Sequence, residues 1–221
     1  TIVGFSSEKE YKKGFGPFAD GFIEAEYCRT NCDCSKVCEN SIRSIKNAIN
    51  KNTCAVIVEP IQGEGGIITP QSGWLKQLRE LCNESNVLLI LDEIQSGLGR
   101  TGKLFAFEHE DIKPDGLILG KALGGGLLPV SAFLSSKEVM SHFNPGSHGS
   151  TFGGNPLAAK VASKALDLLF EDNLIENSKI MGAYLKQKLS EMNHGFIKEI
   201  RGKGLWIGVE LDQGISAKKI C

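Results

Sequence analysis

The stretch SGWLKQLRELCNESNVLLILD, residues 72–92, joins an amphipathic pattern to a run of apolar residues. Its first half places apolar side chains on one helical face, with Ser72 as a candidate N-cap. These side chains are Trp74, Leu75, Leu78, Leu81 and Cys82. The run Val87 to Leu91 is typical of a short buried strand. Since another apolar run, Cys54 to Val58, precedes the helix, the stretch predicts a βαβ unit.

Apolar runs and amphipathic stretches alternate along the rest of the chain. Gly116 to Leu119 and Val130 to Leu134 are further candidate strands. Before them, a helix is marked by Ile42, Ile45 and Ile49. The alternation predicts an α/β domain with a mainly parallel sheet.

The C-terminal part of the chain changes in pattern. Asn155-Pro156 is a typical start of a helix, here continuing to about Phe170, and a second helix is expected over Leu174 to Met192. Two strand-like segments, Phe196 to Ile200 and Leu205 to Leu211, follow around a turn that contains Arg201. We therefore expect residues 1–168 to belong to a large domain and residues 169–221 to begin a small, incomplete α+β domain.

The composition excludes several classes of protein. Apolar residues are 41% and charged residues 23%, so the chain is neither disordered nor fibrous. Lys and Arg number 25 against 26 Asp and Glu, which leaves no basic footprint for nucleic acid. No apolar run approaches the length of about 18 residues that a membrane span needs. The 26 glycines are an excess, and their clustering indicates tight turns or backbone close to a ligand.

The N-terminus, Thr1-Ile-Val3, shows neither an initiator Met nor a signal peptide. We expect an intracellular protein, located in the cytoplasm, or in the mitochondrial matrix if the source is eukaryotic. Because the initiator Met is missing and the sequence ends at Cys221 just as an amphipathic pattern restarts, we expect a fragment.

Seven cysteines give an odd count, which argues against a closed disulfide framework. Four of them form a C-x3-C-x-C-x3-C cluster at Cys28, Cys32, Cys34 and Cys38. Zinc sites usually have two separated pairs, so we expect no metal site and favour reduced thiols. Cys54 and Cys82 are expected on core faces as small apolar side chains.

The segment Gly97-Leu-Gly99-Arg-Thr-Gly102 matches G-x-G-x-x-G formally. The dinucleotide-binding motif needs its glycines to turn directly from strand to helix, with an acidic residue about 20 positions later. Here Asp92 to Ser96 separate the strand from the first glycine. We therefore do not favour an NAD site.

Polar, glycine-rich segments follow the predicted strands, at the edge of the sheet where α/β proteins bind ligands. Asp92 ends a buried strand, and Lys121 follows Leu117 to Gly120 and precedes three glycines. Alone, each residue has an ordinary structural explanation: a capping Asp, or a solvated loop Lys. Together with the hydroxyls of Ser150 and Thr151 they provide a carboxylate for a pyridinium nitrogen, a desolvated amine and donors for a phosphate. Pyridoxal 5′-phosphate (PLP) requires these three groups.

Four strings support this interpretation: VEPIQGEGG (58–66), LLILDEIQSGLGRTGK (88–103), LILGKALGGG (117–126) and GSHGSTFGGNPLA (146–158). In order and content they resemble the class III, fold type I PLP-dependent aminotransferases, over nearly the whole chain. The resemblance implies a three-layer αβα large domain and a homodimer with shared active sites. Within the family the ornithine aminotransferases are most similar, because of Phe15-Gly-Pro-Phe18 and the spacing between Gly126 and Pro129.

Position by position, the resemblance implies roles for six residues. Lys121 would bind the cofactor covalently and act as the base, and Asp92 would pair with the ring nitrogen. Gln95 would contact the ring hydroxyl. Thr151, helped by Ser150, would bind the phosphate in the partner subunit's site. Glu64 would pair with an arginine, beyond this chain, that holds the substrate carboxylate.

Other polar residues are expected to be structural. They are Glu59, His109 and His148, with Arg100 and Arg201 as exposed turn residues. Leu128 stands where ornithine enzymes often have an aromatic residue, and the cysteine cluster has no counterpart in the family pattern.

The resulting expectation is transfer of the δ-amino group of ornithine to 2-oxoglutarate, with an amino acid and a 2-oxo acid as the small-molecule partners. N-Acetylornithine or another ω-amino donor is the alternative within the family. A non-catalytic remnant is the alternative outside it, and this chain alone is expected to be inactive.

Overall fold

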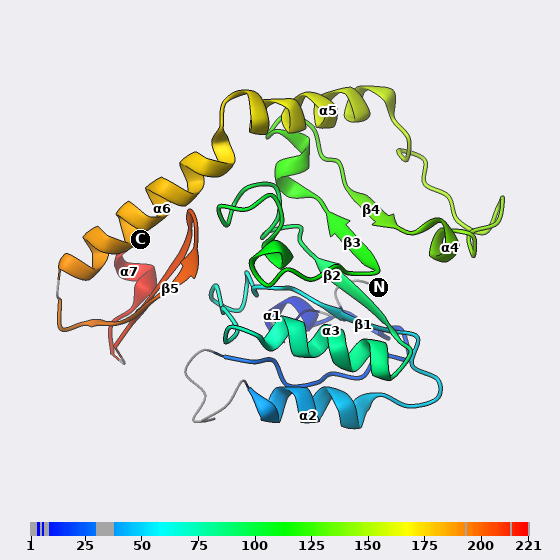
Figure 1. Ribbon diagram of the computed structural model, residues 1–221, viewed down its shortest axis with the longest axis horizontal. Coiled ribbons are helices and arrows are strands. Elements are labelled where there is room, and N and C mark those ends of the chain that lie inside the picture. The colour runs from blue at the N-terminus through cyan, green and yellow to red at the C-terminus, as the bar shows by residue number, and fades with distance from the viewer. Residues whose placement is uncertain are drawn as a thin grey trace.

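The computed structural model describes residues 4, 6, 9–29, 38–192, 194–212 and 214–220. A four-stranded sheet in the order β1-β2-β3-β4 lies at the centre of this part of the chain (Figure 1). Its strands are β1 (Ala55–Val58), β2 (Leu88–Asp92), β3 (Gly116–Leu119) and β4 (Ala132–Ser135). The first three are parallel, and β4 is antiparallel to β3. The predicted α/β fold with a mainly parallel sheet is confirmed.

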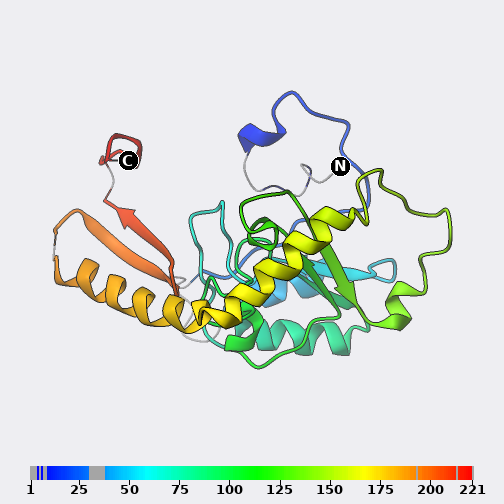
Figure 2. The same ribbon diagram turned by 90° about the horizontal axis from the view of Figure 1, so that it is seen from above.

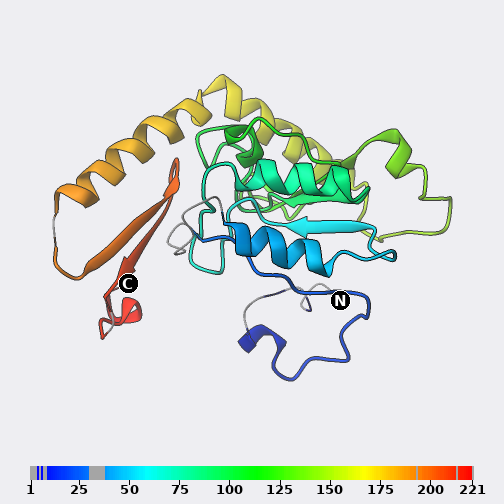
Figure 3. The same cartoon turned by 60° about the horizontal axis from the view of Figure 1, so that its bottom comes forward.

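Four longer helices accompany the strands: α2 (Glu39–Ala48), α3 (Trp74–Glu84), α5 (Pro156–Glu171) and α6 (Leu174–Glu191). The short elements are α1 (Lys9–Lys12), α4 (Lys137–Met140), α7 (Ala217–Ile220) and the 3-10 turns η2 (Ala106–His109) and η3 (Lys121–Gly124). Helix α3 packs against β2 and α2 packs against α3, as Figures 1 and 3 show. Helix α5 lies over η3, and Figure 2 shows it crossing above the sheet.

The core lies between α3 and the sheet. All five apolar side chains of the predicted α3 face are buried, together with Leu89 and Leu91 of β2. Trp74 is fully buried, and its indole N–H donates to the Ser41 hydroxyl of α2 at 3.1 Å. The ring of Tyr27 meets the Trp74 ring edge-on at 4.9 Å. Burial of aromatic and aliphatic area here therefore joins the N-terminal segment, α2 and the sheet into one core.

The start of α3 differs from the prediction. Gly73, with φ of 87°, is the N-cap, and the Ser72 side chain makes no capping bond. Instead the Glu110 carboxylate accepts hydrogen bonds from the backbone N–H groups of Gly73 at 2.9 Å and Lys76 at 3.0 Å. A carboxylate satisfies two donors at once and complements the positive end of the helix, so it replaces the local hydroxyl cap.

The cysteines divide into buried and exposed thiols. Cys28, Cys38 and Cys82 are buried, and burial raises the pKa of Cys82 to about 11. The expectation for Cys54 is wrong: it is exposed, because it stands in the loop just before β1. Cys32 and Cys34 lie outside the described residues. Among the described residues, no three His, Cys, Asp or Glu side chains are grouped to hold a metal ion.

The C-terminal part consists of α6 and a hairpin of β5 (Ile197–Lys203) and β6 (Trp206–Leu211), at the left of Figure 1. The predicted domain boundary at residues 168 and 169 falls inside α5 and stays a prediction. Arg201 was expected in an exposed turn, but it lies within β5 with its side chain only 12% exposed, because it pairs with two carboxylates. Within the described residues no helix has the length and apolarity to span a membrane.

Candidate active site

Asp92 and Lys121 follow neighbouring parallel strands at the same edge of the sheet. Asp92 is the last residue of β2 and pairs with Ile118 of β3, while Lys121 comes two residues after β3 ends. The charges of both residues act on a third group, the Glu59 carboxyl at the end of β1. Three strand ends thus converge on one place, as expected for a ligand site in a parallel sheet.

The Asp92 carboxylate is half-buried and oriented by its own loop. Its Oδ1 accepts a hydrogen bond from the backbone N–H of Ile94 at 3.0 Å. This short-range bond fixes the side chain at the strand end. The carboxylate is therefore available to pair with a cationic group at the edge of the sheet.

Lys121 begins η3 in a left-handed conformation, with φ of 44°. Such a conformation is uncommon for a residue with a side chain and is often found at functional sites. The side chain is exposed, so the desolvation expected for it is not provided by this chain. Leu123 and Gly124 of the same turn are buried, and helix α5 packs against this turn. The backbone that follows Lys121 is therefore held in place.

Gln95 and Glu64, both predicted as site residues, lie together. Gln95 Nε2 donates to Glu64 Oε1 at 3.5 Å, and the Tyr11 hydroxyl donates to Glu64 Oε2 at 3.2 Å. A Cβ atom at Gly63 would lie 2.6 Å from Gln95 Nε2. Glycine at 63 therefore lets the amide of Gln95 approach the backbone beside Glu64.

Glu59 is part of the same loop. Its Oε2 accepts a hydrogen bond from the Gly63 N–H at 2.9 Å, which closes the turn after β1. Burial raises the pKa of Glu59, and this hydrogen bond opposes the rise. The negative charges of Asp92 and Glu64 raise the pKa further, whereas the positive charge of Lys121 lowers it. The bond to Gly63 supports the structural role expected for Glu59, but its carboxyl lies nearer the site than the sequence indicated.

Glu93 was missed by the sequence analysis. Its side chain is 1% exposed and accepts hydrogen bonds from the Ala106 N–H at 2.7 Å, the Phe107 N–H at 3.0 Å and the Ser96 hydroxyl at 3.1 Å. Burial raises the pKa of Glu93 to about 7 against these three bonds. Glu93 thereby ties the loop that carries Gln95 to η2. The Asp-Glu pair directly after an apolar strand was the available signal, but it does not say which acid turns inward.

Ser150 and Thr151 do not join this group within the chain. Ser135, the last residue of β4, pairs with Gly116, the first residue of β3, so α4 and the loop after it begin at the opposite edge of the sheet from Lys121. Figure 1 shows that loop extending away from the sheet, and both hydroxyl residues are exposed. Their predicted role in the partner subunit's site stays a prediction.

The group at the sheet edge fits the ring side of PLP. It contains an amine for the aldehyde, a carboxylate for the protonated ring nitrogen and an amide for the ring hydroxyl, on Lys121, Asp92 and Gln95. The hydroxyls proposed for the phosphate follow α4, at the opposite edge of the sheet, so the described residues of one copy bring together only the ring-facing part of such a site.

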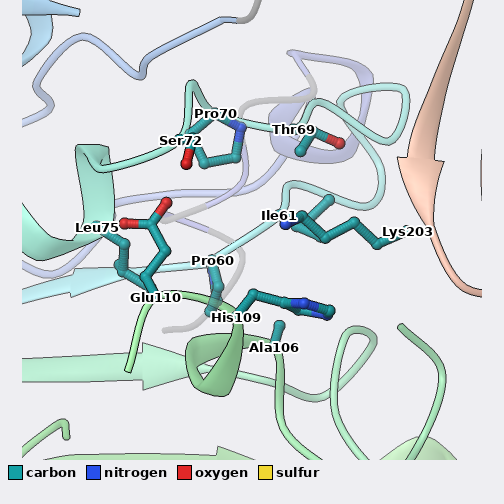
Figure 4. A pocket seen from close by; sticks show the side chains of 10 residues that line it. All are labelled: Pro60, Ile61, Thr69, Pro70, Ser72, Leu75, Ala106, His109, Glu110 and Lys203. Atoms are coloured by element: carbon teal, nitrogen blue, oxygen red, sulfur yellow. The ribbon is translucent and has the colours of Figure 1, made fainter. Parts of the chain in front are cut away.

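A cavity of about 200 Å³ lies between the β1–α3 loop, η2 and the hairpin (Figure 4). His109, Glu110 and Lys203 are its titratable lining residues. His109 Nε2 lies 3.2 Å from both the carbonyl oxygen and the hydroxyl of Thr101. Burial, with the nearby charge of Lys203, lowers the pKa of His109 to about 4. A neutral, half-buried His bonded to its own loop agrees with the structural role expected for it.

We expect His109 to make folding stability fall in acid. The folded protein keeps this ring neutral to about pH 4, whereas the unfolded chain takes up a proton near pH 6.5. Its contribution is therefore complete above pH 6.5 and is lost as the pH falls toward 4. With a discount for partial exposure, the loss is about 1 to 2 kcal/mol.

Urea unfolding at pH 7 and pH 4.5 checks this expectation. His109→Gln should lose less stability between the two pH values than the wild type does. His148→Gln is the matched control, because His148 is exposed and contacts the Phe143 ring. Equal acid losses in the wild type and His109→Gln would show that His109 is not the group responsible.

Comparisons with known proteins agree with one another. The family model Aminotransferase class-III matches residues 1–221. Ornithine aminotransferase 2 of Staphylococcus saprophyticus is 51% identical over 219 residues, which are 99% of this chain and 52% of the relative. The ornithine aminotransferase of Toxoplasma gondii, solved with PLP at partial occupancy, has a TM-score of 0.84 and 42% identity, over 93% of this chain and 46% of that one.

An acetylornithine aminotransferase of Elizabethkingia anophelis is also similar, with a TM-score of 0.76 and 45% identity, over 80% of this chain and 46% of that one. The chain spans about half the length of the curated relatives it matches.

Proposed function

The chain belongs to the class-III aminotransferases, and from this we propose that its protein transfers the δ-amino group of ornithine to 2-oxoglutarate, giving glutamate semialdehyde and glutamate. The cofactor of this family is pyridoxal 5′-phosphate. When bound, it withdraws electrons from the carbon that bears the transferred amine. The observation that supports the proposal best is the convergence of Asp92 and Lys121 at adjacent strand ends, beside the loop where Gln95 contacts Glu64.

Each residue has a defined part in the proposed reaction. The Asp92 carboxylate would pair with a protonated ring nitrogen and so maintain its positive charge. The Lys121 amine would hold the cofactor at its aldehyde carbon, and the free amine would serve as the base for the proton on the carbon that bears the transferred amine. Gln95 donates from its amide to the ring hydroxyl. These roles need only a carboxylate, an amine and an amide held at one edge of the sheet.

The remaining parts of the proposal concern groups that one copy of this chain does not bring together. We propose that Ser150 and Thr151 bind the cofactor phosphate in the partner subunit of a homodimer. Glu64, held between Tyr11 and Gln95, pairs with an arginine outside this chain that receives the substrate carboxylate. Residues 1–168 belong to the large domain and residues 169–221 to the small one.

The donor preference tests the function. In a complete protein that contains this chain, we expect faster turnover of ornithine than of N-acetylornithine, with 2-oxoglutarate as the acceptor. The family strings and the identity to ornithine aminotransferases motivate this choice. Initial rates with the two donors, at matched concentrations, decide it. A preference for the acetylated donor would favour the alternative activity and leave the cofactor chemistry unchanged.

N-Acetylornithine is kept as the second candidate because the Elizabethkingia anophelis enzyme, named for that donor, is 45% identical over the region it shares with this chain. A non-catalytic role is separated by a simpler measurement. Addition of PLP to the complete protein should produce an absorbance band of the lysine-bound cofactor that free PLP lacks. A protein without that band would be a remnant and not an enzyme.

A further inference from the structure

Arg201 joins the C-terminal hairpin to the loop that carries Glu64. From β5, its Nε donates to the carbonyl oxygen of Gly66 at 2.9 Å, across 135 positions of sequence. Its Nη1 donates to Glu199 at 3.1 Å and to Glu210 at 2.6 Å. The guanidinium group therefore uses different nitrogens for the hairpin and for the loop.

Two carboxylates of the hairpin hold the guanidinium group of Arg201. Glu199 and Glu210 are cross-strand partners in the hairpin, where like charges directly opposite each other repel. Arg201 lies between them and removes that repulsion, with its side chain 12% exposed and theirs 20% and 35%. The two charge-assisted bonds hold Nη1 at the hairpin, and Nε is left to donate to the loop.

Glycines on both sides make room for the contact between Arg201 and the Glu64 loop. A Cβ atom on Gly66, whose φ is 108°, would lie 3.2 Å from Arg201 Nη2. A Cβ atom on Gly208, the cross-strand partner of Arg201, would lie 3.2 Å from the Gly66 oxygen. Two glycines at facing positions thus let the hairpin and the loop approach closely.

Glu64 is consequently held from both sides of its loop. On the sheet side, Glu59 accepts the Gly63 N–H at 2.9 Å, and Gln95 reaches Glu64 itself at 3.5 Å. On the hairpin side, Arg201 holds Gly66, two residues after Glu64. The Gly66 and Ile67 N–H groups both donate to the Gly63 carbonyl, so the segment between the two anchors is a single tight turn.

We propose that Arg201 is a positioning residue that sets the place of Glu64 from the C-terminal hairpin. It acts through the Gly66 carbonyl and does not contact Glu64. The proposal rests on the proposed function, because the Glu64 carboxylate matters for substrate binding only if it orients the group that receives the substrate carboxylate. Movement of the hairpin would then change substrate affinity and leave the chemistry at Lys121 unaffected.

Arg201→Lys tests this in the complete protein. A lysine keeps a positive charge for Glu199 and Glu210, so the hairpin should remain, but it lacks the Nε donor to Gly66. Lys198→Gln is the matched control, because Lys198 lies on β5 like Arg201. This variant removes an exposed ion pair with Glu210 of β6 and leaves the contact of Arg201 with the loop in place. A second variant, Gly66→Ala, disturbs the same contact from the loop side.

Two measurements separate positioning from stability. Amide hydrogen exchange over residues 62–68 should become about tenfold faster in Arg201→Lys and stay at the wild-type rate in Lys198→Gln. The KM for ornithine should rise about fivefold in Arg201→Lys, the size expected for one net hydrogen bond, with kcat within about twofold. Combining Arg201→Lys with Gly66→Ala should cost less than the sum of the two single effects, since both disturb one contact, while Gly66→Ala alone also strains a backbone with φ of 108°.

Unchanged exchange over residues 62–68 in Arg201→Lys would overturn the proposal, and so would equal changes of KM and kcat in Arg201→Lys and Lys198→Gln. If the wild-type protein does not turn over ornithine, the proposed function fails, while the exchange measurement still decides whether Arg201 positions the Glu64 loop.

Discussion

Replacing Lys121 by alanine in a complete protein that contains this chain is expected to abolish covalent attachment of PLP and to lower transamination on the order of 10⁴-fold. Lys121 would supply both the amine that binds the cofactor and the base that moves the proton, and loss of a general base alone costs roughly 10²- to 10⁴-fold. No effect of this size is expected from replacing any other lysine of the chain.

The expectation depends on the position of Lys121 and not only on its residue type. Its charge acts on Glu59 at the strand ends, next to the Asp92 carboxylate. Lys103, which also lies in a glycine-rich loop after a strand, instead acts on His109 in the cavity between the β1–α3 loop, η2 and the hairpin. Alanine keeps a Cβ atom on the left-handed backbone at 121, so the variant changes the amine without relieving local strain.

Borohydride reduction followed by peptide mapping gives the direct measurement. The wild type and a Lys103→Ala control should carry the pyridoxyl group on Lys121, and Lys121→Ala should carry none. Thermal unfolding of the cofactor-free proteins should be similar in all three, because the Lys121 side chain is exposed. A pyridoxyl group on Lys103 in the wild type would show that the site is assigned to the wrong residue.

The sequence sufficed for features that depend on neighbours along the chain. Apolar runs located the four strands of the central sheet to within two residues, and the Asn155-Pro156 start of α5 is confirmed, with the Asn155 side chain accepting from the Leu157 N–H at 2.9 Å. Asp92 and Lys121 could be predicted as a pair because parallel strands end at one edge.

Features that depend on distant partners could not be predicted. Glu93 is buried because N–H groups 13 and 14 residues later close over it. Arg201 was assigned to an exposed turn because its loop partner is 135 residues away. Ser72 satisfies the local rule for a helix cap, yet Glu110 provides the bonds. In each case a tertiary contact outweighs a local preference, and a single sequence contains no signal for it.

Close packing of a glycine against backbone is another feature that the sequence could not predict. At Gly182 it leads to the second prediction of a large effect. Gly182 lies in the middle of α6, where a glycine normally costs about 1 kcal/mol relative to alanine. Sequence reasoning alone would therefore expect Gly182→Ala to stabilise the protein. The structure predicts the opposite sign.

A Cβ atom on Gly182 would collide with the carbonyl group of Gly204, at the turn of the hairpin. The turn cannot move away from α6, because Gly204 already packs closely against the 100–102 loop: a Cβ atom on Gly204 would lie 2.7 Å from the Arg100 oxygen. Hydrogen bonds fix the same place: Ser178 Oγ donates to the Arg100 carbonyl at 2.9 Å, and the Leu205 N–H donates to it at 3.1 Å. The hairpin turn is thus held between α6 and the 100–102 loop.

We therefore expect Gly182→Ala to destabilise the protein by at least about 2 kcal/mol, because a collision with fixed backbone exceeds the gain of about 1 kcal/mol in helix propensity. Ala183→Gly, at the exposed neighbouring position of α6, is the matched control and should cost about 1 kcal/mol from propensity alone. Urea unfolding of the wild type and both variants measures the two free energies. If Gly182→Ala unfolds at a higher urea concentration than the wild type, α6 does not pack on the hairpin turn as described, and the hairpin could not then hold Arg201 against the Glu64 loop.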